Sequence, residues 1–169
     1  LILHGPKKIG KTAVLKQIES GALNPPFIGI YLDFGQVALD SLSALYGEIA
    51  NAGLNALARL NIELETINQT EFIADPAKAL HQQFLLPAGK MLQEKRPFNQ
   101  TDHRQLLFLF DNTHLFLEQI NSGTLPAHSL ENLQAHLTTD SIAKALFAFA
   151  DRADKPVVED PALQNGLFY

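Results

Sequence analysis

The N-terminal segment carries the residue pattern best suited to chemistry in this chain. Residues 5–12 read Gly-Pro-Lys-Lys-Ile-Gly-Lys-Thr and match G-x-x-x-x-G-K-[ST] at every fixed position. Glycine at the two fixed places lets the backbone turn tightly, so that its N–H groups can face an anion. The lysine and the hydroxyl residue that end the pattern suit phosphate oxygens and a magnesium ion. The pattern therefore predicts a loop that binds the phosphates of a nucleotide.

Individual roles within this loop follow from the chemistry of its side chains. Lys11 is expected to reach the β- and γ-phosphates, and the Thr12 hydroxyl is expected to bind Mg²⁺. The helix that starts near Thr12 would direct the positive end of its dipole toward the phosphates. Lys7 and Lys8 could add positive potential around phosphate, although solvated loop residues are the default interpretation of both. The residues predicted to bind the nucleotide are Gly5, Pro6, Lys7, Lys8, Ile9, Gly10, Lys11, Thr12 and Ala13.

A second candidate group ends the most strand-like run of the chain. Residues 106–110 are all apolar, and Asp111 and Asn112 follow them. An acid at such a strand end helps to hold Mg²⁺ in phosphate-loop NTPases, so Asp111 is expected to share the metal with Thr12. An apolar strand that ends in aspartate is common by itself, and the upstream loop is what favours a metal site. The predicted catalytic residues are Lys11, Asp111 and Asn112.

The elements that must position these residues follow from the apolar pattern. Apolar runs of strand length alternate with longer amphipathic stretches, which predicts a three-layer α/β/α fold with a mainly parallel sheet. The predicted strands are residues 1–4, 27–32, 106–110 and 145–150. The predicted helices are residues 12–20, 40–56, 114–121, 129–137 and a long segment from about residue 75 to 91. Pro87 and Gly89 disfavour a regular helix, so a break within that long segment is predicted at these residues.

Composition limits the classes of protein to which the chain can belong. Its 169 residues suffice for one domain with a real core, so residues 1–169 are assigned to a single domain. A formal net charge of −5 argues against an overall basic field for nucleic acid, and the absence of cysteine excludes disulfides and thiolate metal sites. No apolar run reaches the ~18 residues that would span a bilayer. No secretory signal is visible either, and we expect a cytoplasmic protein without a membrane partner.

Several segments together resemble a known family, the signal-transduction ATPases with numerous domains, or STAND ATPases, which are relatives of the AAA+ proteins. The resemblance covers about residues 1–150 and is carried by LILHGPKKIGKTAVLKQI, FIGIYLDFGQ and QLLFLFDNTHLF. Residues 40–46 stand where bacterial and archaeal members have the pattern DSLxALLYxLA. The resemblance implies a sheet in the order 5-1-4-3-2, ATP with Mg²⁺ as the ligand, and a molecular switch coupled to oligomerisation.

The chain departs from this family pattern in two respects. Members usually place a glutamate directly after the magnesium aspartate, where this chain has Asn112, which can orient water but is a poor general base. Many also have an acid where this chain has His114, a secondary candidate for a catalytic or sensing role. The fifth strand and the helical lid would lie beyond Tyr169, so we expect a fragment of a larger multidomain protein. Asp151 is the nearest candidate for the polar sensor that ends the fourth strand.

The expected function is Mg²⁺-dependent ATP binding with slow hydrolysis, used as a signalling switch. Self-association or other protein partners would act through the missing domains. A scaffold that binds the nucleotide without hydrolysing it is the main alternative, because Asn112 is a poor general base. A DNA-associated AAA+ ATPase is the third reading, but this segment has no basic patch or helix-turn-helix to support it. The choice of ATP over GTP rests on the family resemblance and on the lack of an N-K-x-D run.

Overall fold

The computed structural model describes residues 1–6, 8–23, 26–94, 104–139 and 141–150. Within these ranges the strands form one four-stranded sheet in the order β1-β4-β3-β2, and every neighbouring pair is parallel. The strands are β1 (Ile2–Gly5), β2 (Phe27–Asp33), β3 (Gln105–Asp111) and β4 (Ala143–Ala150). The predicted parallel α/β sheet is confirmed, and these four strands stand in the expected relative order 1-4-3-2. The expected fifth strand, helical lid and Asp151 lie outside the described residues.

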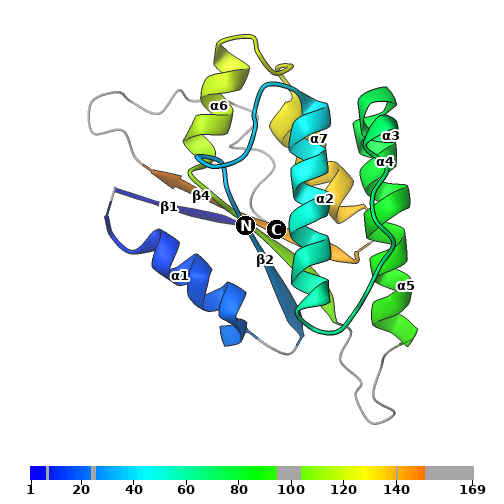
Figure 1. The fold of residues 1–169 in the computed structure, drawn as a ribbon. Helices are drawn as coiled ribbons and strands as arrows, with labels where there is room; N and C mark the ends of the chain where they lie inside the picture. The colour runs from blue at the N-terminus through cyan, green and yellow to red at the C-terminus, as the bar shows by residue number, and fades with distance from the viewer. Residues whose placement is uncertain (7, 24–25, 95–103, 140, 151–169) are drawn as a thin grey trace.

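Helices cover both faces of this sheet, as Figure 1 shows. On one face, α1 (Lys11–Gln17) buries Leu15 against Leu109 of β3 and Leu146 of β4. The opposite face carries the larger core, which includes side chains from β2, β3 and β4. The helical elements packed into that larger core are α2 (Leu42–Ala58), α3 (Gln69–Ala74), α4 (Pro76–Leu80), α5 (Leu86–Glu94), α6 (Thr113–Asn121) and α7 (Ser129–Thr138). The described residues therefore form a helix layer, a sheet and a second, thicker helix layer.

Local signals explain where several helices begin. Ser41 caps α2, because its hydroxyl accepts a hydrogen bond of 3.1 Å from the Ala44 N–H. Asp75 caps α4 in the same way through the Lys78 N–H, with Pro76 at the first helical position. The short helix α3 has no counterpart among the predicted elements. Its six residues are too few to show the periodicity on which the predictions rest.

The predicted break at Pro87 is wrong, because the helix continues through it. A π-helical turn over His81–Leu85 joins α4 to α5, and Pro87 is the second residue of α5. A proline ring clashes with the carbonyl four residues earlier in a regular α-helix. The wider π-helical turn lies at that point of the backbone and gives the ring room. The segment thus changes from α-helical to π-helical hydrogen bonding and back, and the helix does not end at Pro87.

An aromatic stack fixes the carboxyl ends of the strands. Phe110 of β3 stacks on Phe34, which follows β2, at a ring-centroid distance of 5.2 Å, and on Phe147 of β4 at 4.9 Å. Phe34 also stacks on Phe116 of α6 at 5.1 Å. All four rings are at most 2% exposed. They pack on the face opposite α1, so they hold the strand ends rigid behind the polar residues on the α1 face.

The ends of β2 and β3 lie side by side in register. Asp33 pairs with Asp111 across the two strands, and the Phe34 N–H donates to the Asp111 carbonyl oxygen at 3.1 Å. The loop that starts at Gly5 leaves β1 at the same edge, because all strands run parallel. No helix in the described part of the chain is long and apolar enough to cross a membrane.

Candidate functional site

The loop between β1 and α1 is tightly folded around its own lysine. The Lys11 ammonium donates to the carbonyl oxygens of Gly5 and Pro6 at 2.5 and 2.6 Å. Lys8 and Gly10 both have positive φ, at 68° and 93°, and these left-handed residues curl the backbone. Gly5 has φ 152°, a backbone conformation that residues with a Cβ rarely adopt, so glycine suits the start of the loop. The loop therefore keeps the charge of Lys11 beside the start of α1.

Asp111 is the polar centre of the site. It is 4% exposed, and its Oδ2 accepts a hydrogen bond of 2.6 Å from the Thr12 hydroxyl. The same Oδ2 accepts from the Tyr31 hydroxyl at 3.0 Å, while Oδ1 accepts from the Asn112 N–H at 2.9 Å. All three donors are neutral, so they satisfy the carboxylate without cancelling its charge. Three elements, α1, β2 and β3, thus converge on one buried carboxylate.

Tyr31 comes from β2, two residues before Asp33 on the same face of the strand. Its ring lies beneath the Lys16 ammonium, which is 3.3 Å from the ring centroid. Burial, followed by the hydrogen bond to Asp111, raises the pKa of Tyr31 well above its usual range. The hydroxyl therefore remains a protonated donor to Asp111 at neutral pH.

Asn112 follows Asp111 in a left-handed conformation with φ 54° and precedes α6. This conformation suits asparagine better than most residues. Its Nδ2 donates to Asp33 Oδ1 at 2.7 Å, and the Gly35 N–H donates to the same oxygen at 2.8 Å. The Gly35 contact gives Asp33 a role in the turn that follows β2. The link to Asn112 is an additional role, which joins the ends of β2 and β3 through their side chains.

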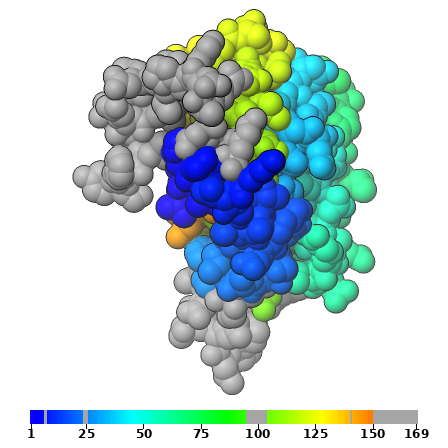
Figure 2. Space-filling view, turned by 90° about the vertical axis from the view of Figure 1, so that its left-hand side faces the viewer, coloured from blue at the N-terminus to red at the C-terminus, as the bar shows by residue number. Residues whose placement is uncertain are grey.

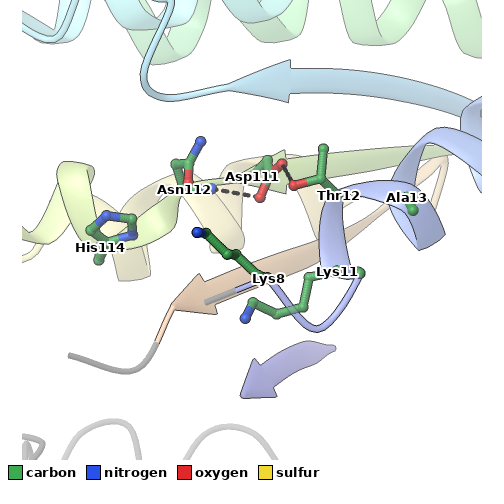
Figure 3. A pocket seen from close by; sticks show the side chains of 8 residues that line it. Lys8, Lys11, Thr12, Ala13, Asp111, Asn112 and His114 are labelled. Carbon is green, nitrogen blue, oxygen red and sulfur yellow. Dashed lines mark hydrogen bonds between the residues drawn. The ribbon is translucent and has the colours of Figure 1, made fainter. Parts of the chain in front are cut away.

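A cavity of about 540 Å³ lies between the loop and the end of β3. The residues that line it are Lys8, Gly10, Lys11, Thr12, Ala13, Asp111, Asn112 and His114. Figure 3 shows Lys8 reaching from the loop toward Asn112, with His114 beside it on α6. In Figure 2 the N-terminal segment, which contains the loop and α1, forms the centre of the visible surface. The lining of the cavity combines two cationic side chains, Lys8 and Lys11, with one buried carboxylate, Asp111.

A larger groove of about 850 Å³ runs beside α3, the π-helical turn over His81–Leu85 and α5, but its charge is unsuited to phosphate. Its charged lining residues are Glu63, Glu65, Glu71, Lys90 and Glu94. Four carboxylates against one ammonium repel an anion. Among the cavities of the described residues, the one at the loop is therefore the better candidate for a phosphorylated ligand.

The structure brings together most, but not all, of the predicted site residues. Lys8, Gly10, Lys11, Thr12 and Ala13 line the cavity together with both predicted residues from the end of β3. The remaining loop residues serve the loop itself or point outward. Gly5 and Pro6 accept from the lysine, Ile9 is 57% exposed and covers Gly5, and Lys7 lies outside the described residues.

Sequence reasoning missed Tyr31 and the link between Asp33 and Asn112. A tyrosine inside the otherwise apolar run 27–32 was a usable signal, since its spacing from Asp33 places both on one face of the strand. No sequence pattern indicated the contact between Asp33 and Asn112, because that contact depends on β2 and β3 being neighbours in the sheet.

The donor set at the carboxyl end of β3 fits a small divalent cation. A hydroxyl and a carboxylate oxygen lie 2.6 Å apart, and both are hard ligands of the kind that Mg²⁺ prefers. No cluster of three histidine, cysteine or carboxylate side chains occurs among the described residues, so a metal held by protein side chains alone is not indicated there. Comparisons with protein-family models, curated proteins and solved structures found no match to this chain.

Proposed function

We propose that the chain binds ATP together with Mg²⁺ through the loop 5–12 and Asp111, as a STAND-type phosphate-loop NTPase that acts as a nucleotide-controlled switch. The observation that carries this proposal is the hydrogen bond of 2.6 Å from the Thr12 hydroxyl to Asp111, at the edge of the loop cavity. Magnesium is typically held by one or two protein oxygens while phosphate and water complete its shell. Bound here, it would offset the negative charge of the phosphates.

The cavity supports a polyphosphate ligand on grounds of size and charge. Its volume of about 540 Å³ lies within the range of small-molecule sites. Lys8 and Lys11 line it from the loop side and supply two positive charges for phosphate oxygens. Thr12 and Asp111 lie on the sheet side and supply the metal ligands. Adenine as the base is proposed from the family resemblance described above.

Slow hydrolysis is the expected consequence of Asn112. An amide cannot accept the proton of an attacking water, and a positioned general base contributes about 10²–10⁴-fold to a rate. Phosphoryl transfer depends mainly on positioning and charge stabilisation, which Lys11 and the Asp111 carboxylate can still supply. One amide hydrogen of Asn112 Nδ2 is committed to Asp33, so the second amide hydrogen and the carbonyl oxygen are the groups that would orient water. We therefore propose a low turnover rate.

A non-hydrolysing scaffold is the second candidate, and the same contact favours it. The bond of 2.7 Å from Asn112 to Asp33 holds the residue in one orientation between two strand ends. A residue fixed in this way is a poor substitute for a mobile base. The two candidates differ in one measurable quantity, the release of phosphate from bound ATP.

Binding is tested by calorimetric titration of the purified chain with ATP and Mg²⁺. Lys11→Ala should weaken ATP binding by about tenfold or more, because a charged hydrogen-bond donor to phosphate is lost. Lys90→Ala is the matched control, since Lys90 is an exposed lysine on α5 outside the loop cavity. Equal affinity of wild type and Lys11→Ala would contradict the proposal.

Turnover is tested on the same proteins by following phosphate release. Release that is slow in the wild type and absent from Lys11→Ala supports the switch enzyme. Tight ATP binding with no release by the wild type supports the scaffold. Stimulation of release by added DNA would instead revive the third reading.

A further inference from the structure

The Tyr31 hydroxyl shares one oxygen of the candidate metal ligand with Thr12. Both hydroxyls donate to Asp111 Oδ2, at 3.0 Å from Tyr31 and 2.6 Å from Thr12. We propose that Tyr31 is a positioning residue that orients the Asp111 carboxylate and thereby sets how much Mg²⁺ the chain needs to bind its nucleotide. This inference rests on the proposed function, because it assigns a regulator of metal affinity to the same site.

A closed ring of contacts holds Tyr31 in place. Thr12 and Lys16 are four residues apart in α1 and therefore lie on the same face of that helix. Thr12 contacts Asp111, Lys16 lies over the Tyr31 ring, and Tyr31 contacts Asp111. Lys16 is itself held by Glu19 at 2.9 Å. This closed set of contacts joins α1, β2 and β3 at the Asp111 carboxylate. A movement of Tyr31 would therefore change the position of Asp111.

The acceptor sites of the carboxylate explain how Tyr31 would influence a cation. An ionised carboxylate has about four acceptor positions, two on each oxygen. Thr12 and Tyr31 occupy two on Oδ2, and the Asn112 N–H occupies one on Oδ1. Among the contacts of the described residues, one acceptor position on Oδ1 is left, and it gives a cation or its water a single direction of approach. Without the Tyr31 hydroxyl, rotation about the terminal torsion of Asp111 becomes easier, since that torsion is intrinsically broad.

Charge and protonation agree with this role. The hydroxyl is a neutral donor, so it orients the carboxylate without replacing the cation that the carboxylate would bind. A tyrosine hydroxyl is ordinarily protonated at neutral pH, so it can serve as the donor to Asp111. A lysine at this position would neutralise Asp111 and compete with a metal, whereas a phenol does not.

The test is the Mg²⁺ dependence of ATP binding by the whole chain. Tyr31→Phe removes one oxygen and keeps the ring beneath Lys16. We expect the Mg²⁺ concentration that gives half-maximal ATP binding to rise by about three- to tenfold, the size of a typical net hydrogen bond, because Tyr31 acts on the metal only through Asp111. ATP affinity in excess EDTA should stay within about twofold of the wild type, because Tyr31 does not line the loop cavity. Tyr46→Phe, the same change at a buried tyrosine of α2, should leave both quantities unchanged.

Lys16→Met gives a graded companion to this test. It keeps much of the length of the side chain and removes the ammonium that lies over the Tyr31 ring. The Mg²⁺ midpoint should shift in the same direction by less than in Tyr31→Phe, because the hydroxyl contact itself remains. Circular dichroism and melting temperature establish that each variant is folded before titration.

Four results would overturn the inference. An unchanged midpoint in Tyr31→Phe shows that the hydroxyl does not influence the metal, and a lowered midpoint shows that it competes with the metal. Equal weakening with Mg²⁺ and in EDTA shows a general structural role instead of a role in positioning Asp111. Failure of the wild type to bind ATP overturns the proposed function together with this inference, and it is recognised before any variant is made.

Discussion

The carboxyl ends of β2 and β3 look alike in sequence and differ in structure. Each strand is an apolar run that ends in aspartate, and Asp33 and Asp111 lie opposite one another in register. Asp111 is buried at 4% exposure and collects hydroxyl donors from α1 and β2. Asp33 is less buried and collects donors from the turn after β2 and from Asn112. Asp111 therefore belongs to the candidate metal site, whereas Asp33, which lies opposite it in register, belongs to a turn.

Position in the sheet accounts for this difference. Among the described strands, β3 lies between β4 and β2, whereas β2 has a strand neighbour on one side only. Residues of α1 pack on β3 and β4, with Leu15 against Leu109 and Leu146, and this packing brings Thr12 onto Asp111. An aspartate at the end of an edge strand has no such helix start beside it. Neighbouring elements, rather than local sequence, assign the two carboxylates their roles.

The largest expected effect separates the two aspartates by isosteric changes. Asp111→Asn should reduce the Mg²⁺-dependent gain in ATP affinity by about tenfold or more, because even outer-shell partners of a metal contribute 10–100-fold. Asp33→Asn should change that gain by less than about twofold, since its partners are the Gly35 N–H and Asn112. The measurement is calorimetric titration of each variant with ATP, with and without Mg²⁺. Equal losses in the two variants would remove the distinction between the strand ends.

The next effect concerns the contact between the strand ends. Asn112→Glu places a third carboxylate against Asp33 and puts glutamate at φ 54°, a conformation that costs about 1–2 kcal/mol for residues other than glycine or asparagine. We expect the free energy of unfolding in urea to fall by about 2 kcal/mol. Asn112→Glu combined with Asp33→Asn should recover about half of this loss, because the repulsion between carboxylates is gone. Strict additivity of the two changes would show that Asp33 and Asn112 are uncoupled.

A smaller loss is expected from Asp33→Ala. This change removes Asp33 Oδ1, the one oxygen that accepts from both the Gly35 N–H and the Asn112 amide. We expect the loss of this shared acceptor to lower the free energy of unfolding by about 1 kcal/mol. Asp40→Ala is a matched control at an exposed aspartate, where the change should lie within about 0.5 kcal/mol. Both values come from urea unfolding monitored by circular dichroism. A loss in Asp33→Ala no larger than in the control would show that the turn does not depend on its side chain.

The smallest effect is on the pH dependence of stability. Burial raises the pKa of Tyr46 to about 12, and burial with the Asp111 contact raises that of Tyr31. A tyrosine with a raised pKa in the folded state stabilises the fold fully below its unfolded pKa of about 10, and this contribution is lost as pH rises through the folded pKa. Unfolding free energy should therefore decline from about pH 10 toward pH 12. The decline should be shallower in Tyr31→Phe and in Tyr46→Phe, and identical slopes in all three proteins would contradict this account.

The strands were predictable because their signal is local. Residues 27–33 and 105–111 are apolar on both faces, as parallel strands buried on both sides are, and their predicted bounds differ from the observed ones by a residue or two at most. The long segment from residue 75 was predicted as a helix, but its passage through Pro87 was not. Accommodation of that ring depends on the π-helical turn before it, and a pattern with a period of 3.6 residues cannot indicate such a turn.

The candidate site was predictable in part for the same reason. The loop motif directly identifies Lys11 and Thr12 as candidate site residues. The apolar strand that ends in an acid identifies Asp111 as a third candidate. Tyr31 was not predicted, because its role requires that β2 lie beside β3 and that α1 cover the same face. The contact of Asp33 with the Gly35 N–H is local to one turn, whereas its bond to Asn112 joins two strands and involves a residue in the left-handed backbone conformation.

The sequence by itself determined the strands, most of the helices and the residues of the loop, because hydrophobic periodicity, capping and glycine placement act over a few neighbouring positions. Only the tertiary structure showed that Thr12 donates directly to Asp111 and that Tyr31 donates to the same carboxylate oxygen. Those contacts form between segments separated by 80 or more positions in the chain. Their formation depends on the order of the strands in the sheet and on the packing of α1 against β3 and β4, and both are properties of the assembled core.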